Sequence, residues 1–143
     1  MKTEEKDLLL KDLCSRLPYG VKVLYQVGSQ IHDRKFFDGK QYEELKHSSI
    51  LDDWLKCHFK PYLFPLSSMT EEQYNSLRES GILDNCSRSY EYVNPHIYGI
   101  SFIFKKFKTY SLELIEWLNK NHFDYRGLID KGLAIDATGL NIY

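Results

Sequence analysis

The sequence lacks any long apolar run. No stretch of its 143 residues approaches the roughly 20 consecutive apolar residues that a membrane-spanning helix needs. The opening segment, Met1–Leu10, has only three leucines in a row, with acidic residues before them, which is not the pattern of a secretory signal peptide. These absences predict a soluble protein without a membrane partner, and we expect it to act in the cytoplasm.

Cysteine is scarce as well. The chain has three cysteines, Cys14, Cys57 and Cys86, and an odd number gives no disulfide framework. Cys57, His58, Cys86 and His96 are a set of soft ligands that could hold a metal, and Cys86 with His96 could form a nucleophile and its base. Structural zinc sites use closely spaced ligand pairs such as C-x-x-C, however, and this chain has none. We therefore expect no metal and no cofactor.

Positive and negative charges are nearly balanced. The common catalytic sequence motifs are also missing. With 19 basic and 20 acidic residues, the chain has no global field to attract nucleic acid or acidic lipid. It contains no phosphate-binding loop of the form G-x-x-x-x-G-K-[ST], no G-x-G-x-x-G and no G-x-S-x-G. Nucleotide hydrolysis and serine hydrolase chemistry are disfavoured, and we predict no catalytic residue. An enzyme whose site is assembled from scattered residues would leave no such motif, so that alternative stays open.

Aromatic residues are abundant. Eleven tyrosines and eight phenylalanines supply large buried areas, and tyrosine also suits the rims of interfaces. The chain has the length of one domain and shows no repeat or linker, so residues 1–143 are expected to form a single compact domain.

The first half of the chain predicts a helix followed by antiparallel strands. Helical spacing of Leu9, Leu13 and Leu17 indicates an N-terminal helix that Pro18 would end. Alternating residues then predict a strand over 21–27 and a returning strand over 31–37. A third strand near 40–45 and a short helix near 50–55 are also expected.

The second half predicts two more helices. The segment Lys60–Pro65 has two prolines that lack ladder donors, so it is expected at a sheet edge and not in the centre. Thr70 and Gln73 form a capping box for a surface helix near 71–80. Alternation over 100–105 predicts another strand, and residues 111–121 an amphipathic helix. Without regular βαβ alternation, this order indicates an α+β fold with a mostly antiparallel sheet.

The segment that follows the last helix holds the first candidate site. His122, Asp124 and Arg126 occupy every second position, so in an extended backbone they would project to one side and could bind a ligand. The alternative is structural, because an irregular buried segment needs side chains to satisfy its backbone groups. The sequence favours the structural interpretation.

A second candidate site mixes aromatic and basic residues. Phe102 and Phe104 lie beside Lys105, Lys106 and Lys108, and stacking rings next to lysines are typical of single-stranded nucleic-acid binding. Amphipathic strands also bury Phe and expose Lys routinely, so nucleic acid is not the favoured partner.

Three blocks of the sequence resemble a family of small uncharacterised proteins found in gut Bacteroidota, their prophages and related phages. The blocks are Leu8–Cys14 with Arg16–Val23, Lys60–Leu63 with Pro65–Glu72, and Trp117–Tyr143. They cover about half of the chain. The resemblance implies an accessory protein of a phage or mobile element, acting in a bacterial cytoplasm, and supplies no catalytic residue.

Together these observations favour a non-enzymatic module that binds a host or phage protein. Tyr and Phe are enriched at interfaces, and the stretches between the three blocks, about 26–58 and 83–110, are expected to meet the partner. The alternatives are a single-stranded nucleic-acid-binding protein and a protein that sequesters a small ligand such as a nucleotide. The last would need a pocket lined by aromatics and Arg126.

Overall fold

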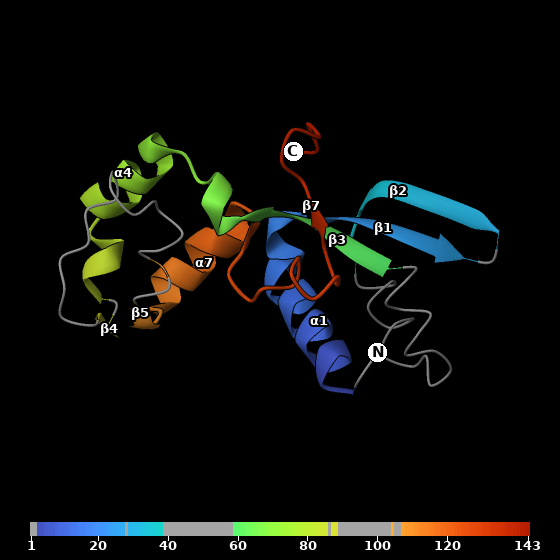
Figure 1. The fold of residues 1–143 in the computed structure, drawn as a ribbon, viewed down its shortest axis with the longest axis horizontal. Helices are drawn as coiled ribbons and strands as arrows, with labels where there is room; N and C mark the ends of the chain where they lie inside the picture. The colour runs from blue at the N-terminus through green and yellow to red at the C-terminus, as the bar shows by residue number, and fades with distance from the viewer. Residues whose placement is uncertain (1–2, 28, 39–58, 86, 89–103, 105–106) are drawn as a thin grey trace.

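The computed structural model describes residues 3–27, 29–38, 59–85, 87–88, 104 and 107–143 (Figure 1). In chain order its elements are α1 (Thr3–Arg16), the 3-10 turn η1 (Leu17–Tyr19), β1 (Lys22–Val27), β2 (Gln30–Phe36), β3 (Phe59–Pro65), η2 (Leu66–Ser68), α4 (Glu71–Glu79), η3 (Ile82–Asn85), β4 (Ser87–Arg88), β5 (Phe107–Thr109), α7 (Leu112–Lys120), β6 (Phe123–Asp124) and β7 (Ile135–Asp136). The predicted α+β class is confirmed.

The main sheet of the described part is mixed. Its strands follow the order β2-β1-β3-β6, and β7 also pairs with β3. The pairs β1–β2 and β1–β3 are antiparallel, whereas β6 and β7 run parallel to β3. The predicted hairpin is confirmed: β1 and β2 pair from Lys22 opposite Phe36 to Val27 opposite Gln30. The short strands β4 and β5 pair separately.

Strand β3 lies in the middle of this sheet, so the prediction of an edge position for Lys60–Pro65 is wrong. Pro61 stands opposite Val23 in the last pair of the β1 ladder, and Pro65 is the last residue of β3. Each missing N–H therefore falls where a ladder ends. Between the prolines, Phe64 donates to the His122 carbonyl at 2.9 Å, and Leu63 accepts from Ala137 at 2.8 Å.

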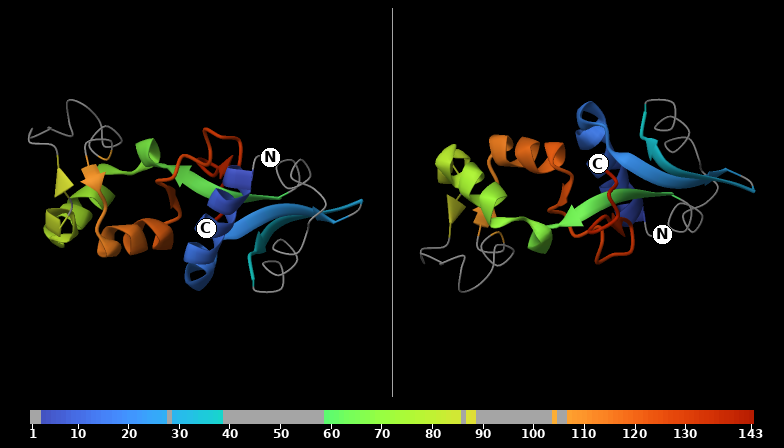
Figure 2. Two further views of the ribbon diagram at one scale, coloured as in Figure 1. Left: turned by 90° about the horizontal axis from the view of Figure 1, so that it is seen from below. Right: turned by 90° about the horizontal axis from the view of Figure 1, so that it is seen from above.

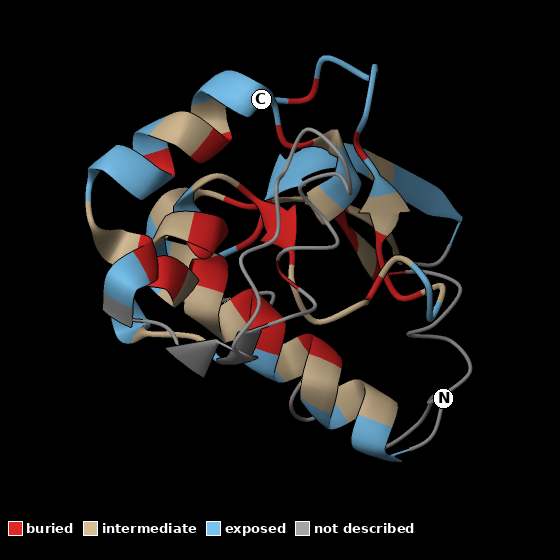
Figure 3. Cartoon of the chain, turned by 60° about the vertical axis from the view of Figure 1, so that its left-hand side comes forward, coloured by how far each residue is buried: buried red, intermediate tan, exposed pale blue. Residues whose placement is uncertain are grey.

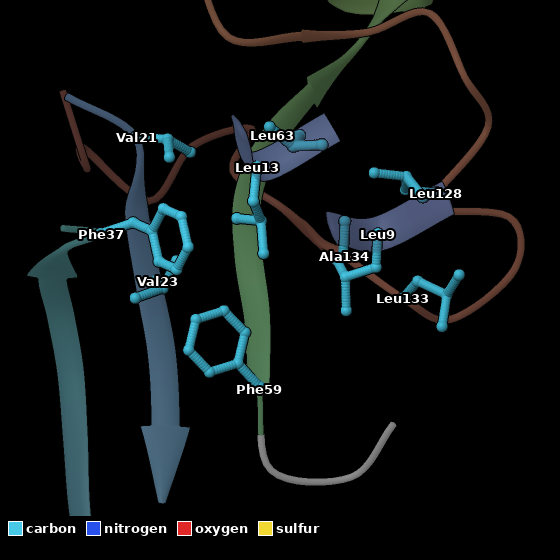
Figure 4. Packing of buried hydrophobic residues seen from close by; sticks show 10 residues of the cluster. All are labelled: Leu9, Leu13, Val21, Val23, Phe37, Phe59, Leu63, Leu128, Leu133 and Ala134. Atoms are coloured by element: carbon cyan, nitrogen blue, oxygen red, sulfur yellow. The ribbon is translucent and has the colours of Figure 1, made fainter. Parts of the chain in front are cut away.

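Helix α1 packs against the sheet through a stripe at positions i, i+3, i+4 and i+7. Glu4 and Glu5 stand in its first turn and Arg16 in its last, as the helix dipole favours. The residues buried along the stripe are Leu9, Asp12, Leu13 and Arg16. Leu9 and Leu13 join the first core, which Figure 4 shows between α1, β1, β3 and the turn after β6.

A second core lies between α4 and α7, which sit side by side at the opposite end of the molecule from β1 and β2 (Figure 2). Both helices begin as the sequence predicts. Thr70 and Gln73 form the reciprocal capping box of α4, and Ser111 accepts from the Leu114 amide at the start of α7. Figure 3 shows buried residues along the inner sides of the helices.

Residues 100–105 were expected to be a strand, and that prediction is wrong at Phe104. This residue is helical, and its side chain is buried in the second core, where it meets Tyr110 edge-on at 6.2 Å. The other residues of this stretch lie outside the described part of the chain. The strand expected near 40–45 and the helix expected near 50–55 lie outside the described residues.

Candidate functional site

The candidate site surrounds β6, which leaves the end of α7 through a sharp turn. Asn121 caps the helix by donating its side-chain amide to the Trp117 carbonyl at 2.8 Å. His122 then has a φ of +58°, a left-handed backbone that reverses the chain. This turn carries Phe123 and Asp124 alongside the end of β3.

Asp124 satisfies the backbone of the turn that follows β6. Its carboxylate oxygens accept from the amide of Leu128 at 2.9 Å and from that of Ile129 at 2.8 Å. The side chain is buried, where unmade backbone bonds would be costly. This is the kind of contact that the structural interpretation of the cluster anticipated.

Arg126 turns to helix α1. Its Nη1 atom lies 3.2 Å from Asp12 Oδ1 and 3.3 Å from Ser15 Oγ, and its guanidinium lies over the Tyr125 ring at 4.8 Å. His122, Asp124 and Arg126 therefore contact three different sets of partners.

A buried ion pair that holds this segment in place was not predicted from the sequence. Arg16 and Asp12 are both fully buried, and Arg16 Nε lies 2.7 Å from Asp12 Oδ2. The same guanidinium donates from Nη2 to Asp12 Oδ1 at 3.1 Å and to the Phe123 carbonyl at 2.8 Å. A signal was present, because both residues fall on the stripe of Leu9 and Leu13. An Asp and Arg four apart are more often an exposed helix pair, however.

Four buried polar atoms around this anchor have no hydrogen-bond partner among the described residues. They are Arg16 Nη1, Asn119 Oδ1, His122 Nδ1 and Tyr125 Oη. All four belong either to Arg16 or to the stretch 119–125 that Arg16 binds.

Tyr143 joins β1 to β3 where their own pairing stops. Its hydroxyl accepts from the Lys22 amide at 3.0 Å and donates to the Tyr62 carbonyl at 2.8 Å. Lys22 and Tyr62 would form the next pair after Val23 and Pro61. The tyrosine hydroxyl thus takes the place of a ladder bond, and burial raises the pKa of Tyr143 to about 12.

His122 stacks on Tyr143, with ring centroids 3.8 Å apart and an angle of 11° between the planes. Burial of the imidazole, followed by repulsion from Arg16 and Lys22, lowers the pKa of His122 to about 4. At neutral pH the ring is therefore uncharged, with one nitrogen that donates and one that accepts.

Residues of β6 and its flanks line two hollows. His122 and Phe123 line one of about 400 Å³, together with residues of β3 and of the turn before α4. Asp124 and Tyr125 line another of about 350 Å³, beside Pro65 and Tyr110.

The basic and aromatic candidates are described only in part. Phe104 is buried, so its ring cannot stack on a base, and Lys108 belongs to β5. Phe102, Lys105 and Lys106 lie outside the described residues, as do Cys57, His58, Cys86 and His96. Within the described part, no group of three or more His, Cys, Asp or Glu residues could hold a metal ion.

Comparison with known proteins adds no relative. No family model, no curated protein and no solved structure matches this chain. Among the described residues, no helix is long and apolar enough to cross a membrane.

We predict that Arg16→Met destabilises the protein by about 3–5 kcal/mol, because it leaves Asp12 buried without its main partner. The double variant Asp12→Leu, Arg16→Met should recover part of this loss, since no buried charge of the pair remains, while the bond from Arg16 to the Phe123 carbonyl stays lost. Urea unfolding followed by circular dichroism measures both. A loss below about 1 kcal/mol in Arg16→Met would show that the pair does not anchor the segment.

We also predict that His122 lowers the free energy of unfolding when the solution is acidified. The folded pKa of about 4 lies below the ordinary value of 6.5, so the unfolded chain takes up the proton first. The stability that comes from burying a neutral His122 is fully present above pH 6.5 and is lost as the pH falls toward 4. His122→Asn tolerates the positive φ and should show a shallower loss over that window. Identical pH profiles for the two proteins would contradict the assignment.

Proposed function

We propose that this protein is a non-enzymatic module that binds a host or phage protein in a bacterial cytoplasm, with strand β2 as its contact surface. The observation that carries the proposal is the exposure of two large apolar side chains on that strand. Ile31 is 69% exposed and Phe36 is 61% exposed. Burying such side chains against a partner would contribute about 1.5–3 kcal/mol each.

Strand β2 is held firmly enough to present these side chains. It is the terminal strand in the described sheet order, and Tyr62 of β3 reaches past β1 to donate to Asp33 at 2.5 Å. Burial, followed by the Asp33 carboxylate, raises the pKa of Tyr62 to about 12, so this bond persists at neutral pH. A fixed strand loses little conformational freedom on binding, which favours affinity.

Phe36 also has a defined position. The Lys22 ammonium lies 5.2 Å from the centre of its ring, and Gly20 lies below it with a φ of +68°. A side chain at Gly20 would come within 3.4 Å of this ring. That distance is an ordinary van der Waals contact, so it is the left-handed φ of Gly20, and not the Phe36 ring, that favours glycine here.

The source of the partner is inferred from the resemblance to proteins of gut Bacteroidota and their phages. Single-stranded nucleic acid is the second candidate, and its remaining support is Lys108 together with the undescribed Phe102, Lys105 and Lys106. The burial of Phe104 removes one of the two rings on which that candidate depended.

The proposal is tested by affinity capture from lysogenic Bacteroidota cells with three tagged forms of the full chain. These are the natural protein, the double variant Ile31→Ser, Phe36→Ser, and the control Leu112→Ser, which removes an apolar side chain that is 68% exposed on α7. We expect one protein to be retained by the natural chain and the control and lost with the double variant. Circular dichroism should show all three folded.

Recovery of the same proteins with all three forms would contradict a role for β2. Repeated recovery of no protein, together with a gel shift of a short oligonucleotide at low salt, would favour the nucleic-acid alternative instead.

A further inference from the structure

The hollow of about 400 Å³ beside His122 has the size and lining of a small-molecule site. Its volume lies in the range of ligand pockets. Aromatic rings make much of its wall: Phe64, His122, Phe123 and Tyr143. Phe64 lies 5.9 Å from Tyr143 and 6.3 Å from Phe123 between ring centroids, so the rings form one continuous surface.

Tyr143 lies at the edge of this hollow and is 42% exposed as a whole. His122 stacks on its ring and the Lys22 ammonium lies 5.8 Å from the ring centroid, so a ligand meets the remaining exposed part of the side chain. A flat ring laid against such an aromatic surface gains contact area at little entropic cost, because the surface is already ordered.

His122 supplies a fixed polar contact. The residue is only 7% exposed, it lines the hollow, and its Nδ1 atom has no partner among the described residues. A neutral imidazole nitrogen accepts or donates a hydrogen bond according to its tautomer, so the matching ligand carries a polar hydrogen-bonding group.

Lys120 gives the hollow its charge. Among the described lining residues it has the one basic side chain besides His122, and His122 is neutral at pH 7. Lys120 is exposed at the end of α7, where it can meet an anion at the rim. Arg126, which the sequence suggested for this purpose, is bonded to Asp12 and Ser15 instead.

We propose that this hollow binds a small planar aromatic molecule that carries a polar hydrogen-bonding group and one anionic group. The ring lies on the aromatic wall, the polar group faces His122, and the anion pairs with Lys120. Aromatic carboxylates and nucleoside monophosphates share this chemistry. The test of this site does not require that β2 binds a protein.

The test is an NMR titration of the full chain with two matched pairs of probes: indole-3-carboxylate against indole, and adenosine monophosphate against adenosine. We expect amide shifts around Lys120, Asn121 and His122. The anionic member of at least one pair should bind about two- to fivefold more tightly than its neutral counterpart, which is the effect of one partly exposed ion pair. The pair that responds distinguishes a carboxylate from a phosphate ligand.

Two variants and a control complete the test. Lys120→Gln should abolish the preference for the anion, whereas Lys11→Gln, on the exposed side of α1, should leave it unchanged. His122→Asn should weaken all binding while the rest of the spectrum stays folded. The proposal is overturned if none of the four probes shifts these amides at millimolar concentration, or if the neutral and anionic probes bind equally.

Discussion

The buried ion pair between Asp12 and Arg16 is the contact on which the rest of this structure depends. It lies on the stripe of α1 that faces the core, and Arg16 also binds the Phe123 carbonyl. Through this bond the first helix fixes the start of β6, more than a hundred residues away in sequence. Burying two charges costs desolvation free energy, which hydrogen bonds to the charged groups must offset. Arg126 adds a further bond to Asp12. The first helix and the C-terminal segment therefore form one structural unit.

The position of β6 in turn arranges the aromatic hollow. Once Phe123 is held by Arg16, the left-handed backbone of His122 directs its ring onto Tyr143. Tyr143 then bridges Lys22 and Tyr62, and this closes the gap between β1 and β3. The wall of the hollow is thus a consequence of the same network that holds the fold together. Strand β2 lies at the other end of the sheet order from β6, and Phe36 meets the network only through Lys22 among the contacts described.

Sequence signals from neighbouring residues predicted some elements of the fold, but not the contacts between distant segments. The capping box at Thr70, the hairpin of β1 and β2 and the helix after Ser111 each depend on neighbours in sequence, and each is confirmed. The central place of β3 was missed because a proline is tolerated where a ladder ends, and the ends are set by distant strands. The burial of Asp12 and Arg16 was missed for a similar reason. Their position on the stripe of Leu9 and Leu13 pointed inward, but their spacing is that of a surface pair, and the distant Phe123 carbonyl that Arg16 binds cannot be seen in the local sequence.

Native-state hydrogen exchange tests the central claim most directly. Three amides report on the C-terminal unit: Phe64, which donates to the His122 carbonyl, and Leu128 and Ile129, which donate to Asp124. If the buried pair makes one cooperative unit, these amides should exchange at the same free energy of opening as the protected amides of β1. Exchange of the three at a clearly lower free energy, while β1 stays protected, would show that the segment opens by itself and would contradict the account.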